Sequence, residues 1–232
     1  MCGRFVLDSP PELIAASFGL DEVPALTPRY NVAPSQDIPV IRAPAGVREC
    51  VLTRWGLVPA WSKEPRAEYS TINARAETVS TKPTFRAAFR HRRCLVIASG
   101  FFEWARAAGK AKTPYFIRLK APGPFAFAGL WERWEKDGQM LETSSILVTD
   151  ANELMMPLHD RMPVILARDD YGLWLDPGIR DPARLQPLLK PYPAERIQAY
   201  PVSTAVNSVR NDGESLIRPL PSSPAAAQIE LF

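Results

Sequence analysis

The sequence has few of the residues on which disulfide-linked and metal-binding proteins depend. Its cysteines are Cys2, Cys50 and Cys94, and its histidines are His91 and His159. No two cysteines form a CxxC pair, and the histidines are too few for a zinc site of ordinary spacing. We therefore expect neither a disulfide scaffold nor a bound metal or cofactor.

Long apolar runs are also missing. No stretch approaches the roughly 18 consecutive apolar residues of a membrane span. The first residues, MCGRFVLDSP, lack the basic region and the apolar core of a secretory signal. We expect a cytoplasmic protein that does not contact membranes.

The charge is nearly balanced, with 28 basic and 25 acidic residues and a formal net charge of +3. A polyanionic partner must therefore be held by a local patch and not by the field of the whole molecule. A glycine-rich phosphate loop and the HExxH and GxSxG motifs are all missing, so the chemistries that depend on them are disfavoured.

Proline, by contrast, is abundant: the 24 prolines are about twice the usual share of roughly 5%. Helices must therefore be short. We predict one between Ser9 as N-cap and Gly19 as stop, a basic one over residues 84–92, and one over residues 182–190 that is weakened by Pro187.

Short strand-like runs outnumber these helices. They predict strands at Ile38–Arg42, Val47–Val58, Cys94–Ala98, Tyr115–Lys120, Phe125–Trp131, Ser144–Thr149 and Pro163–Ala167. No regular helices separate the runs, so a curved, mainly antiparallel α+β body is favoured over a doubly wound parallel sheet. Only residues 219–232 have the composition of a flexible tail.

Cys2 is chemically special if the initiator methionine is removed, which a small second residue generally permits. The free α-amine has an ordinary pKa of about 7.7–8.0 and can attack an aldehyde to form an imine. The thiol, two carbons away from the amine, then adds to the imine carbon and closes a durable five-membered thiazolidine. The alternative is that Cys2 is merely a small residue near a frayed terminus.

Glu103 lies among aromatic residues in the segment GFFEW. A strand would place Phe101 and Glu103 on one face and Phe102 and Trp104 on the other. Burial there would raise the pKa of the carboxyl, the condition under which a glutamate acts first as a general acid and then as a base. The alternative is a glutamate at the rim that pairs with an arginine.

Two other polar residues lie between apolar segments. His159, in LHDRMP, is one of two histidines, and the other, His91, belongs to a solvated basic helix. A lone histidine is usually structural, and Asn73, in INARAET, would ordinarily be a turn residue. Neither residue establishes a site alone.

Arginines are interleaved with aromatic residues along the chain. The pattern includes Arg4-Phe5, Arg29-Tyr30, Arg54-Trp55, Trp61, Arg75 and the run from Arg86 to Arg93. Guanidinium groups bind phosphates and aromatic rings stack on unpaired bases, so the pattern suits a single-stranded nucleic acid. Stacked arginines also occur on ordinary protein surfaces.

Taken in order, the motifs of the chain resemble those of one family. They are MCGRF, YNVAPSQ, WGLVPAW, INARAET, RRCLVIASGFFEW, FAGLWE, LVTDAN, LHDRMPVIL and PVSTAVNSVRND, and they run from residue 2 to about residue 219. The set resembles the SRAP domain family, once called SOS-response-associated peptidases. At Ile97, where proline is common, and at Leu158, where isoleucine is common, we expect packing changes only.

Members of that family capture abasic sites in single-stranded DNA through a thiazolidine at the N-terminal cysteine. The resemblance implies that Cys2 is the nucleophile and that Asn73 orients the amine and the opened sugar. It implies that Glu103 protonates the ring oxygen and shuttles protons, and that His159 assists ring opening and reversal of the crosslink. Strand cleavage by β-elimination is an expected side activity.

The resemblance also implies DNA contacts and an architecture. The expected contact residues are Arg4, Arg75 and Arg161 for phosphates, Trp61 near the DNA path, and Pro34 and Thr149 along the site. We expect a monomer with one α+β domain over residues 1–218, its mainly antiparallel core of curved sheets barrel-like and flanked by short helices. The partner would be single-stranded DNA with abasic sites, including single-strand/double-strand junctions, in the DNA damage response.

The last residues, Gln228–Phe232 (QIELF), resemble the short peptides with which bacterial repair proteins dock on the sliding clamp. Such a segment would place Leu231 and Phe232 in an apolar pocket of the clamp. The alternative is a tail that folds onto its own domain.

Two other functions stay open at this point. Cys2 would attack an amide, with its own amine as base, in an N-terminal-nucleophile hydrolase, and removal of Met1 is one such reaction. A nucleic-acid-binding module without chemistry would need Arg4, Arg75 and Arg161 but not Cys2. A denaturant-resistant DNA conjugate that requires Cys2 separates covalent capture from both alternatives.

Overall fold

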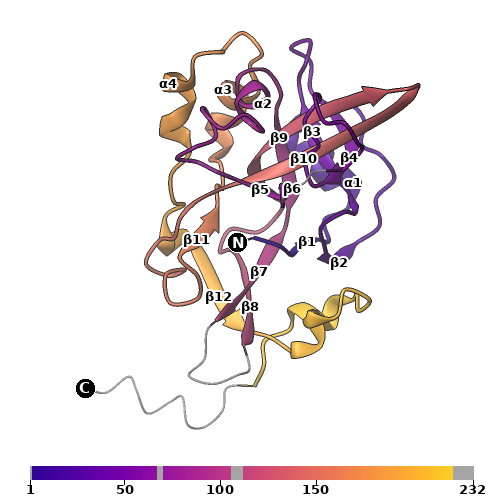
Figure 1. Cartoon of the computed structure of the whole chain (residues 1–232). Helices are drawn as coiled ribbons and strands as arrows, with labels where there is room; N and C mark the ends of the chain where they lie inside the picture. The colour runs from indigo at the N-terminus through magenta and orange to yellow at the C-terminus, as the bar shows by residue number, and fades with distance from the viewer. Residues whose placement is uncertain (1, 67–69, 106–111, 222–232) are drawn as a thin grey trace.

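Two β-sheets form the body of the molecule, with short helices around them (Figure 1). The computed structural model describes residues 2–66, 70–105 and 112–221. The strands are Phe5–Leu7 (β1), Arg29–Val32 (β2), Asp37–Arg42 (β3), Glu49–Trp55 (β4), Asn73–Arg75 (β5), Arg93–Ala98 (β6), Gly100–Ala105 (β7), Thr113–Leu119 (β8), Phe125–Lys136 (β9), Gln139–Asp150 (β10), Arg161–Pro163 (β11) and Ile197–Pro201 (β12). The five-stranded sheet has the order β12-β8-β7-β1-β2, and the seven-stranded sheet has the order β11-β10-β4-β3-β6-β9 with β5 beside β10.

Part of the larger sheet closes on itself. β10 pairs with β4 through Thr143 and Ser144, and with β9 along residues 139–146. Because β4, β3, β6 and β9 are hydrogen-bonded in that order, the five strands β10, β4, β3, β6 and β9 form a closed cycle. The prediction of an α+β fold with a mainly antiparallel, barrel-like core is confirmed.

The helices are short, as the proline content predicted. The α-helices are Pro11–Phe18 (α1), Arg86–His91 (α2), Tyr171–Leu175 (α3) and Pro182–Leu185 (α4), and 3-10 turns lie at Arg168–Asp170, Gln186–Leu188, Ala194–Arg196, Thr204–Asn207 and Glu214–Ile217. Gly19 ends α1 in the left-handed conformation, with a φ of 63°. The predicted stop of this helix is therefore confirmed.

Two details of the predicted helices were wrong. Pro10 and not Ser9 is the N-cap of α1, and the hydroxyl of Ser9 instead lies 3.2 Å from that of Ser99. The helix predicted over residues 182–190 is α-helical only to Leu185. It continues as a 3-10 turn, because Pro187 has no N–H to donate to an α-helical hydrogen bond.

The strand predictions erred mainly at the ends. β4 stops at Trp55, short of the predicted Val58, because Gly56 turns the chain with a φ of 132°. β9 and β10 extend beyond the predicted strands and meet at a tight hairpin turn. Asp137 and Gly138 both have positive φ there, 50° and 76°, as a type I′ turn requires.

The strand predicted over residues 163–167 was wrong. β11 spans Arg161–Pro163 and pairs with β10. The next residue, Val164, donates to the carbonyl of Leu147 in β10 and accepts from the N–H of Ala128 in β9. The chain therefore leaves β10 for β9 here, where Ile165 forms an isolated antiparallel bridge with Phe127 and the N–H of Leu166 donates to the carbonyl of Ala126.

Hydrophobic side chains pack on both faces of the five-stranded sheet. Phe101 belongs to the main core between the sheets, whereas Phe102 packs on the opposite face with Val6 and Val206. The predicted alternation in the GFFEW segment is thus confirmed. No helix within the described ranges is long and apolar enough to cross a membrane. The proposed clamp-binding residues 228–232 lie outside the described residues.

A buried arginine joins α2 and α3 to the sheet. The guanidinium of Arg93, on β6, donates to the backbone carbonyls of Phe89 and Arg90 at the end of α2, and of Trp174 and Asp176 at the end of α3. Burial lowers the pKa of Arg93 to about 10, so the side chain stays charged at neutral pH. Its charge is placed at the negative ends of two helices, where a cation is favoured.

We predict that Arg93→Met lowers the free energy of unfolding by about 3 kcal/mol or more, because four carbonyls lose a charged donor. Urea denaturation measures the change. Arg133→Met is the matched control, since Arg133 is exposed and its removal should cost less than about 0.5 kcal/mol. Equal stability of the two variants would contradict this role of Arg93.

Candidate active site

The N-terminal segment is held beside the GFFEW segment. β1 pairs with β7 in an antiparallel register that sets Phe5 opposite Phe101, and the N–H of Phe102 donates to the carbonyl of Arg4 at 3.0 Å. Continuing this register by two residues brings position 3 opposite Glu103. The sheet therefore places Cys2 close to Glu103. The backbone N–H of Arg4 donates to the Cys2 sulfur.

Three of the predicted catalytic residues influence one another electrostatically. Cys2 is fully buried and Glu103 is 3% exposed. Burial raises the pKa of the Cys2 thiol, and the charge of Glu103 raises it further. Burial also raises the pKa of Glu103, while the charge of His159 acts in the opposite direction. A neutral thiol and a protonated carboxyl are thus favoured side by side.

His159 has two partners on its Nδ1 atom. The backbone N–H of Arg161 donates to Nδ1 at 3.0 Å, and Oδ1 of Asp160 lies 2.9 Å from the same atom. The first contact suits a neutral ring with an unprotonated Nδ1, whereas the second suits a protonated Nδ1. Nδ1 of His159 is therefore held between a backbone donor and a carboxylate acceptor.

Asn73 begins β5, which runs parallel to β10 and pairs Asn73 with Ile146. Its Nδ2 lies 3.5 Å from the carbonyl oxygen of Ile146, and its buried Oδ1 has no hydrogen-bond partner in the described part of the chain. β10 also pairs with β11, so that it joins the INARAET segment to the segment after His159. An unsatisfied amide oxygen at this point is suited to accept a bond from a substrate.

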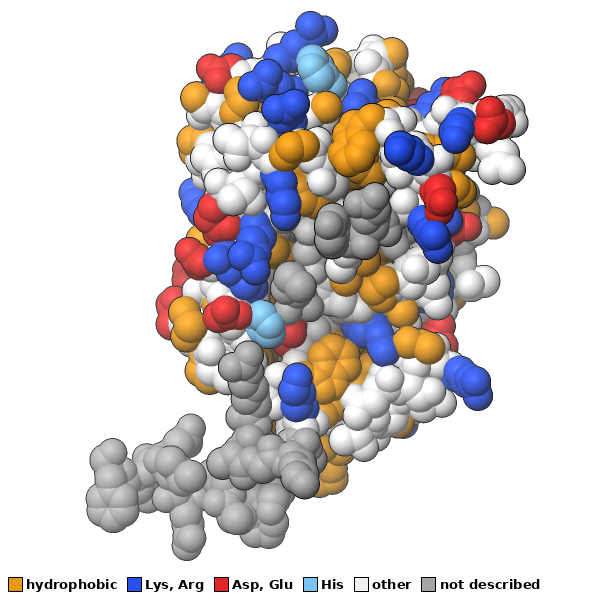
Figure 2. Space-filling view, in the orientation of Figure 1, with side chains coloured by type: hydrophobic (Ala, Val, Ile, Leu, Met, Phe, Trp, Pro, Cys, Tyr) orange, Lys and Arg blue, Asp and Glu red, His pale blue; other side chains and the backbone are white. Residues whose placement is uncertain are grey.

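Two of the three candidate phosphate-binding arginines, Arg75 and Arg161, differ in their ion pairs. Arg75 is exposed and forms no ion pair with any described residue. Arg161 is paired with Glu77, and with Asp150 at 3.1 Å. Figure 2 shows Lys and Arg side chains at several places on one face, not in a single basic field, which agrees with the small net charge.

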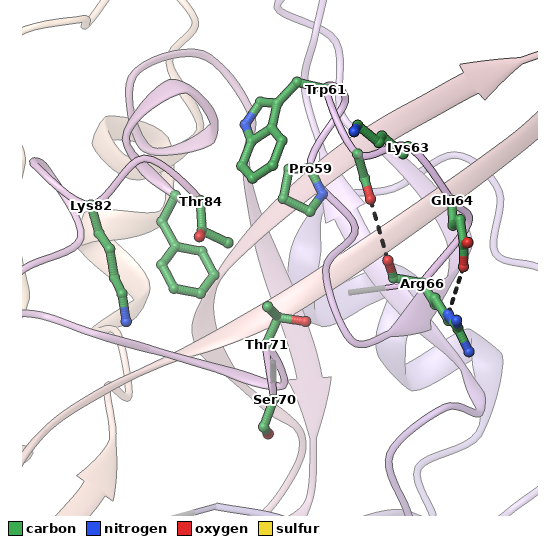
Figure 3. Close-up of a pocket in the computed structure, with 11 residues that line it drawn as sticks. Pro59, Trp61, Lys63, Glu64, Arg66, Ser70, Thr71, Lys82 and Thr84 are labelled. Atoms are coloured by element: carbon green, nitrogen blue, oxygen red, sulfur yellow. Dashed lines mark hydrogen bonds and ion pairs between the residues drawn. The ribbon is translucent and has the colours of Figure 1, made fainter. Parts of the chain in front are cut away.

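Trp61 lies at the edge of a large pocket, whereas Pro34 and Thr149 do not line it. The pocket has a volume of about 700 Å³, and Trp61, which is 69% exposed, lies on it with Pro59, Thr71 and Phe85 (Figure 3). Pro34 is half-buried. Thr149 is buried, and its hydroxyl donates to the carbonyl of Leu189 at 3.2 Å.

The comparisons with known proteins agree with these features. The sequence model of the SOS response associated peptidase (SRAP) family matches residues 1–209. The chain belongs to the SRAP family.

Its relatives include "Abasic site processing protein YoqW" of Bacillus subtilis, 46% identical, with the match covering 94% of this chain and 99% of YoqW. "Abasic site processing protein HMCES" of Xenopus tropicalis is 33% identical over 80% of this chain and 64% of its own length. An X-ray structure of a Bacteroides thetaiotaomicron protein matches with a TM-score of 0.84 and 30% identity, over 94% of this chain and all of that one.

Arg4 of this SRAP domain is held by residues to which the sequence analysis gave no role. The guanidinium of Arg4 donates to Oδ1 of Asn31 and to the carbonyl of Val206, both at 2.8 Å, and to the carbonyl of Asn207 at 3.2 Å. It also lies 5.9 Å from the ring centroid of Trp104. These contacts fix the Arg4 side chain close to Cys2. They leave some of its five N–H donors for a ligand.

Asn31 is the centre of this arrangement. It is 2% exposed, and its Nδ2 lies within hydrogen-bond distance of the carbonyls of Val206, Ser208 and Asn211. The signal in the sequence was indirect: Asn31 lies in YNVAPSQ and its partners lie in PVSTAVNSVRND, two of the family motifs, but 175 positions separate Asn31 from Val206. Only folding shows that the two motifs meet.

We predict that Asn31→Ala lowers the free energy of unfolding by about 2–4 kcal/mol, because the half-buried guanidinium of Arg4 loses its side-chain acceptor and the carbonyls of residues 206–211 lose the buried Nδ2 donor. Amide hydrogen exchange over residues 206–211 should speed up in the same variant. Asn211→Ala, which removes one exposed hydrogen bond of the same segment, is the control and should cost less than about 1 kcal/mol. If exchange there is unchanged in Asn31→Ala, the assigned role of Asn31 is wrong.

Proposed function

We propose that this protein processes abasic sites in DNA by covalent capture through Cys2. The relatives named as abasic site processing proteins include YoqW of Bacillus subtilis at 46% identity. The observation that carries the finer proposal is the burial of Cys2 beside Glu103, in a register set by β1 and β7. A nucleophile beside a carboxyl whose pKa is raised by burial suits imine chemistry better than metal-assisted hydrolysis or binding alone.

The reaction begins when Met1, which lies outside the described residues, is removed. The free amine of Cys2 adds to the aldehyde carbon of the opened deoxyribose, giving a carbinolamine. Protonation of its hydroxyl and loss of one water molecule give the protonated imine, and the thiol then adds to the imine carbon while its proton passes to the carboxylate that supplied the first proton. The product is a thiazolidine that joins protein and DNA with the net loss of one water.

Glu103 supplies protons at two steps. Burial raises the pKa of its carboxyl, which increases the protonated fraction that can donate to the sugar ring oxygen and to the departing hydroxyl of the carbinolamine. The resulting carboxylate accepts the proton of the thiol, whose own pKa is raised by burial. The charge of His159 acts on Glu103 and helps to set the balance between the two forms.

Asn73 and the arginines hold the substrate. The buried Oδ1 of Asn73 accepts a hydrogen bond from the amine or from the opened sugar. Arg75, which is exposed and has no ion pair with the residues that the structure describes, is the arginine best prepared for a phosphate. Arg161 must exchange its carboxylate partners for the phosphate, so its contribution to binding should be smaller.

The family description as a peptidase favours a second candidate function. In this reaction the Cys2 sulfur would attack the carbonyl carbon of Met1 and release the Cys2 amine, and water would then hydrolyse the resulting thioester and release Met1. It uses the same buried residues and precedes capture of the sugar.

The central test uses the processed protein and single-stranded DNA with one abasic site. We expect a conjugate that survives heat and denaturant, and intact single-stranded DNA should give none. Turnover of an amide substrate without a conjugate would support the hydrolase, and reversible binding alone would support a binding module. Either result would overturn the proposal.

We predict that Cys2→Ala, with Met1 removed, loses the heat-stable conjugate but still forms an imine that borohydride traps. Because the imine acidifies the neighbouring C–H, strand cleavage by β-elimination should persist. Cys50→Ala, which changes a half-buried cysteine with no part in the proposed chemistry, should behave like the wild type. A heat-stable conjugate of Cys2→Ala formed without borohydride would refute the thiazolidine.

We predict that Glu103→Gln slows conjugate formation about 100-fold at neutral pH, since it removes a general acid and base. In the wild type the acid-dependent step should weaken as pH rises through the raised pKa of Glu103, because the protonated fraction falls. This limb of the pH–rate profile should vanish in the variant. Glu135→Gln, at an exposed site, should leave the profile unchanged.

A further inference from the structure

A row of cations runs along α2 and the turn before it. Lys82, Arg86 and Arg90 are spaced four residues apart and are all exposed. The N–H of Arg86 donates to the carbonyl of Lys82, so the helical spacing includes this turn. Residues four apart lie on one helical face, about 6 Å from each other. We call Lys82, Arg86, Arg90 and Arg180 the α2 surface.

The charges that act on His91, the last residue of α2, are all positive. Burial lowers the pKa of the exposed His91, and the charges that lower it further are those of Arg180, Arg92, Arg93 and Arg90. No carboxylate is among these causes. Figure 2 shows basic side chains over the upper part of the molecule, where Figure 1 places α2.

The cations of the α2 surface lack protein partners. Within the described ranges, none of its four residues forms an ion pair, whereas the neighbouring Arg92 pairs with Glu132 at 2.7 Å. Like charges four residues apart destabilise a helix by a few tenths of a kcal/mol per pair. A row that is neither paired with carboxylates nor buried is therefore available to a polyanion.

The α2 surface adjoins the large pocket through Lys82. Lys82 lines this pocket together with Trp61 and Thr71, and Figure 3 shows these side chains around one cavity. Asn73 follows Thr71 by two residues. A strand held at Asn73 that continues into the pocket would thus meet Trp61, on which a base can stack, and Lys82.

We propose that the α2 surface binds the phosphodiester backbone of the DNA that flanks the abasic site, on the side beyond the Trp61 pocket. This inference rests on the proposed function. A linear row of three cations suits a chain with one negative charge per nucleotide, and guanidinium groups bind phosphate with two hydrogen bonds. Contacts of this kind position the DNA without reading its sequence.

The test compares Arg86→Glu/Arg90→Glu with Arg118→Glu/Arg196→Glu. Both pairs are exposed arginines. The second pair lies on the five-stranded sheet, with Arg118 on β8 and Arg196 just before β12. Fluorescence anisotropy with an abasic-free single strand of about 30 nucleotides gives the dissociation constant as a function of salt. Thermal unfolding of both variants verifies that they are folded.

We expect the α2 variant to bind at least about 10-fold more weakly at low salt. The slope of log K against log salt should fall by about 1.4, since two phosphate contacts on a single strand contribute about 0.7 each. The control should stay within about 2-fold of the wild type with the same slope. Equal losses in the two variants, or an unchanged slope in the α2 variant, would overturn the proposal.

Substrates of different length locate the contact and separate this proposal from the proposed function. An abasic oligonucleotide of about 7 nucleotides is too short to reach from Cys2 to the α2 surface, so both variants should form its conjugate at the wild-type rate. Extending it on the 5′ side or the 3′ side, as single strand or duplex, identifies the arm whose binding the α2 variant weakens. If the wild type forms the conjugate but the α2 variant binds every extended substrate as well as the wild type does, the α2 proposal alone is overturned. Absence of any wild-type conjugate overturns the proposed function, and the salt slopes still decide the α2 surface.

Discussion

The pairing of β1 with β7 is the constraint on which the site depends. It sets the register between the first residues of the chain and the GFFEW segment, and so brings the neighbourhood of Cys2 to Glu103. The same pairing buries both groups, which raises both pKa values. The first residues of a chain would otherwise be mobile, and the sheet supplies the order that the proposed covalent reaction with a sugar needs.

The remaining elements support this pairing from two directions. β10 joins the strand of Asn73 to the segment that follows His159. Asn31 and Arg4 fasten the segment around Val206 against the outer side of β1, so residues from the end of the domain stabilise its beginning. The site is therefore assembled from all parts of the domain, although its reactive residue lies at one end of the chain.

Much of this arrangement was predictable from local patterns in the sequence. The alternation in GFFEW gave the faces of Phe101 and Phe102 correctly, and Gly19 marked a helix end, because both depend on a few adjacent residues. The change of partner strand at Val164 and the hydrogen bond from Asn31 to Val206 join segments that are distant in sequence, and no local pattern encodes such contacts. The engagement of Arg161 by Glu77 was hidden for the same reason.

The most direct measurement is the intact mass of the conjugate between the native protein and an abasic oligonucleotide, followed by peptide mapping. The account predicts the mass of the chain without Met1 plus that of the oligonucleotide minus one water, with the linkage at Cys2 and insensitive to borohydride. A conjugate on a chain that retains Met1, or a linkage at any other residue, would contradict it.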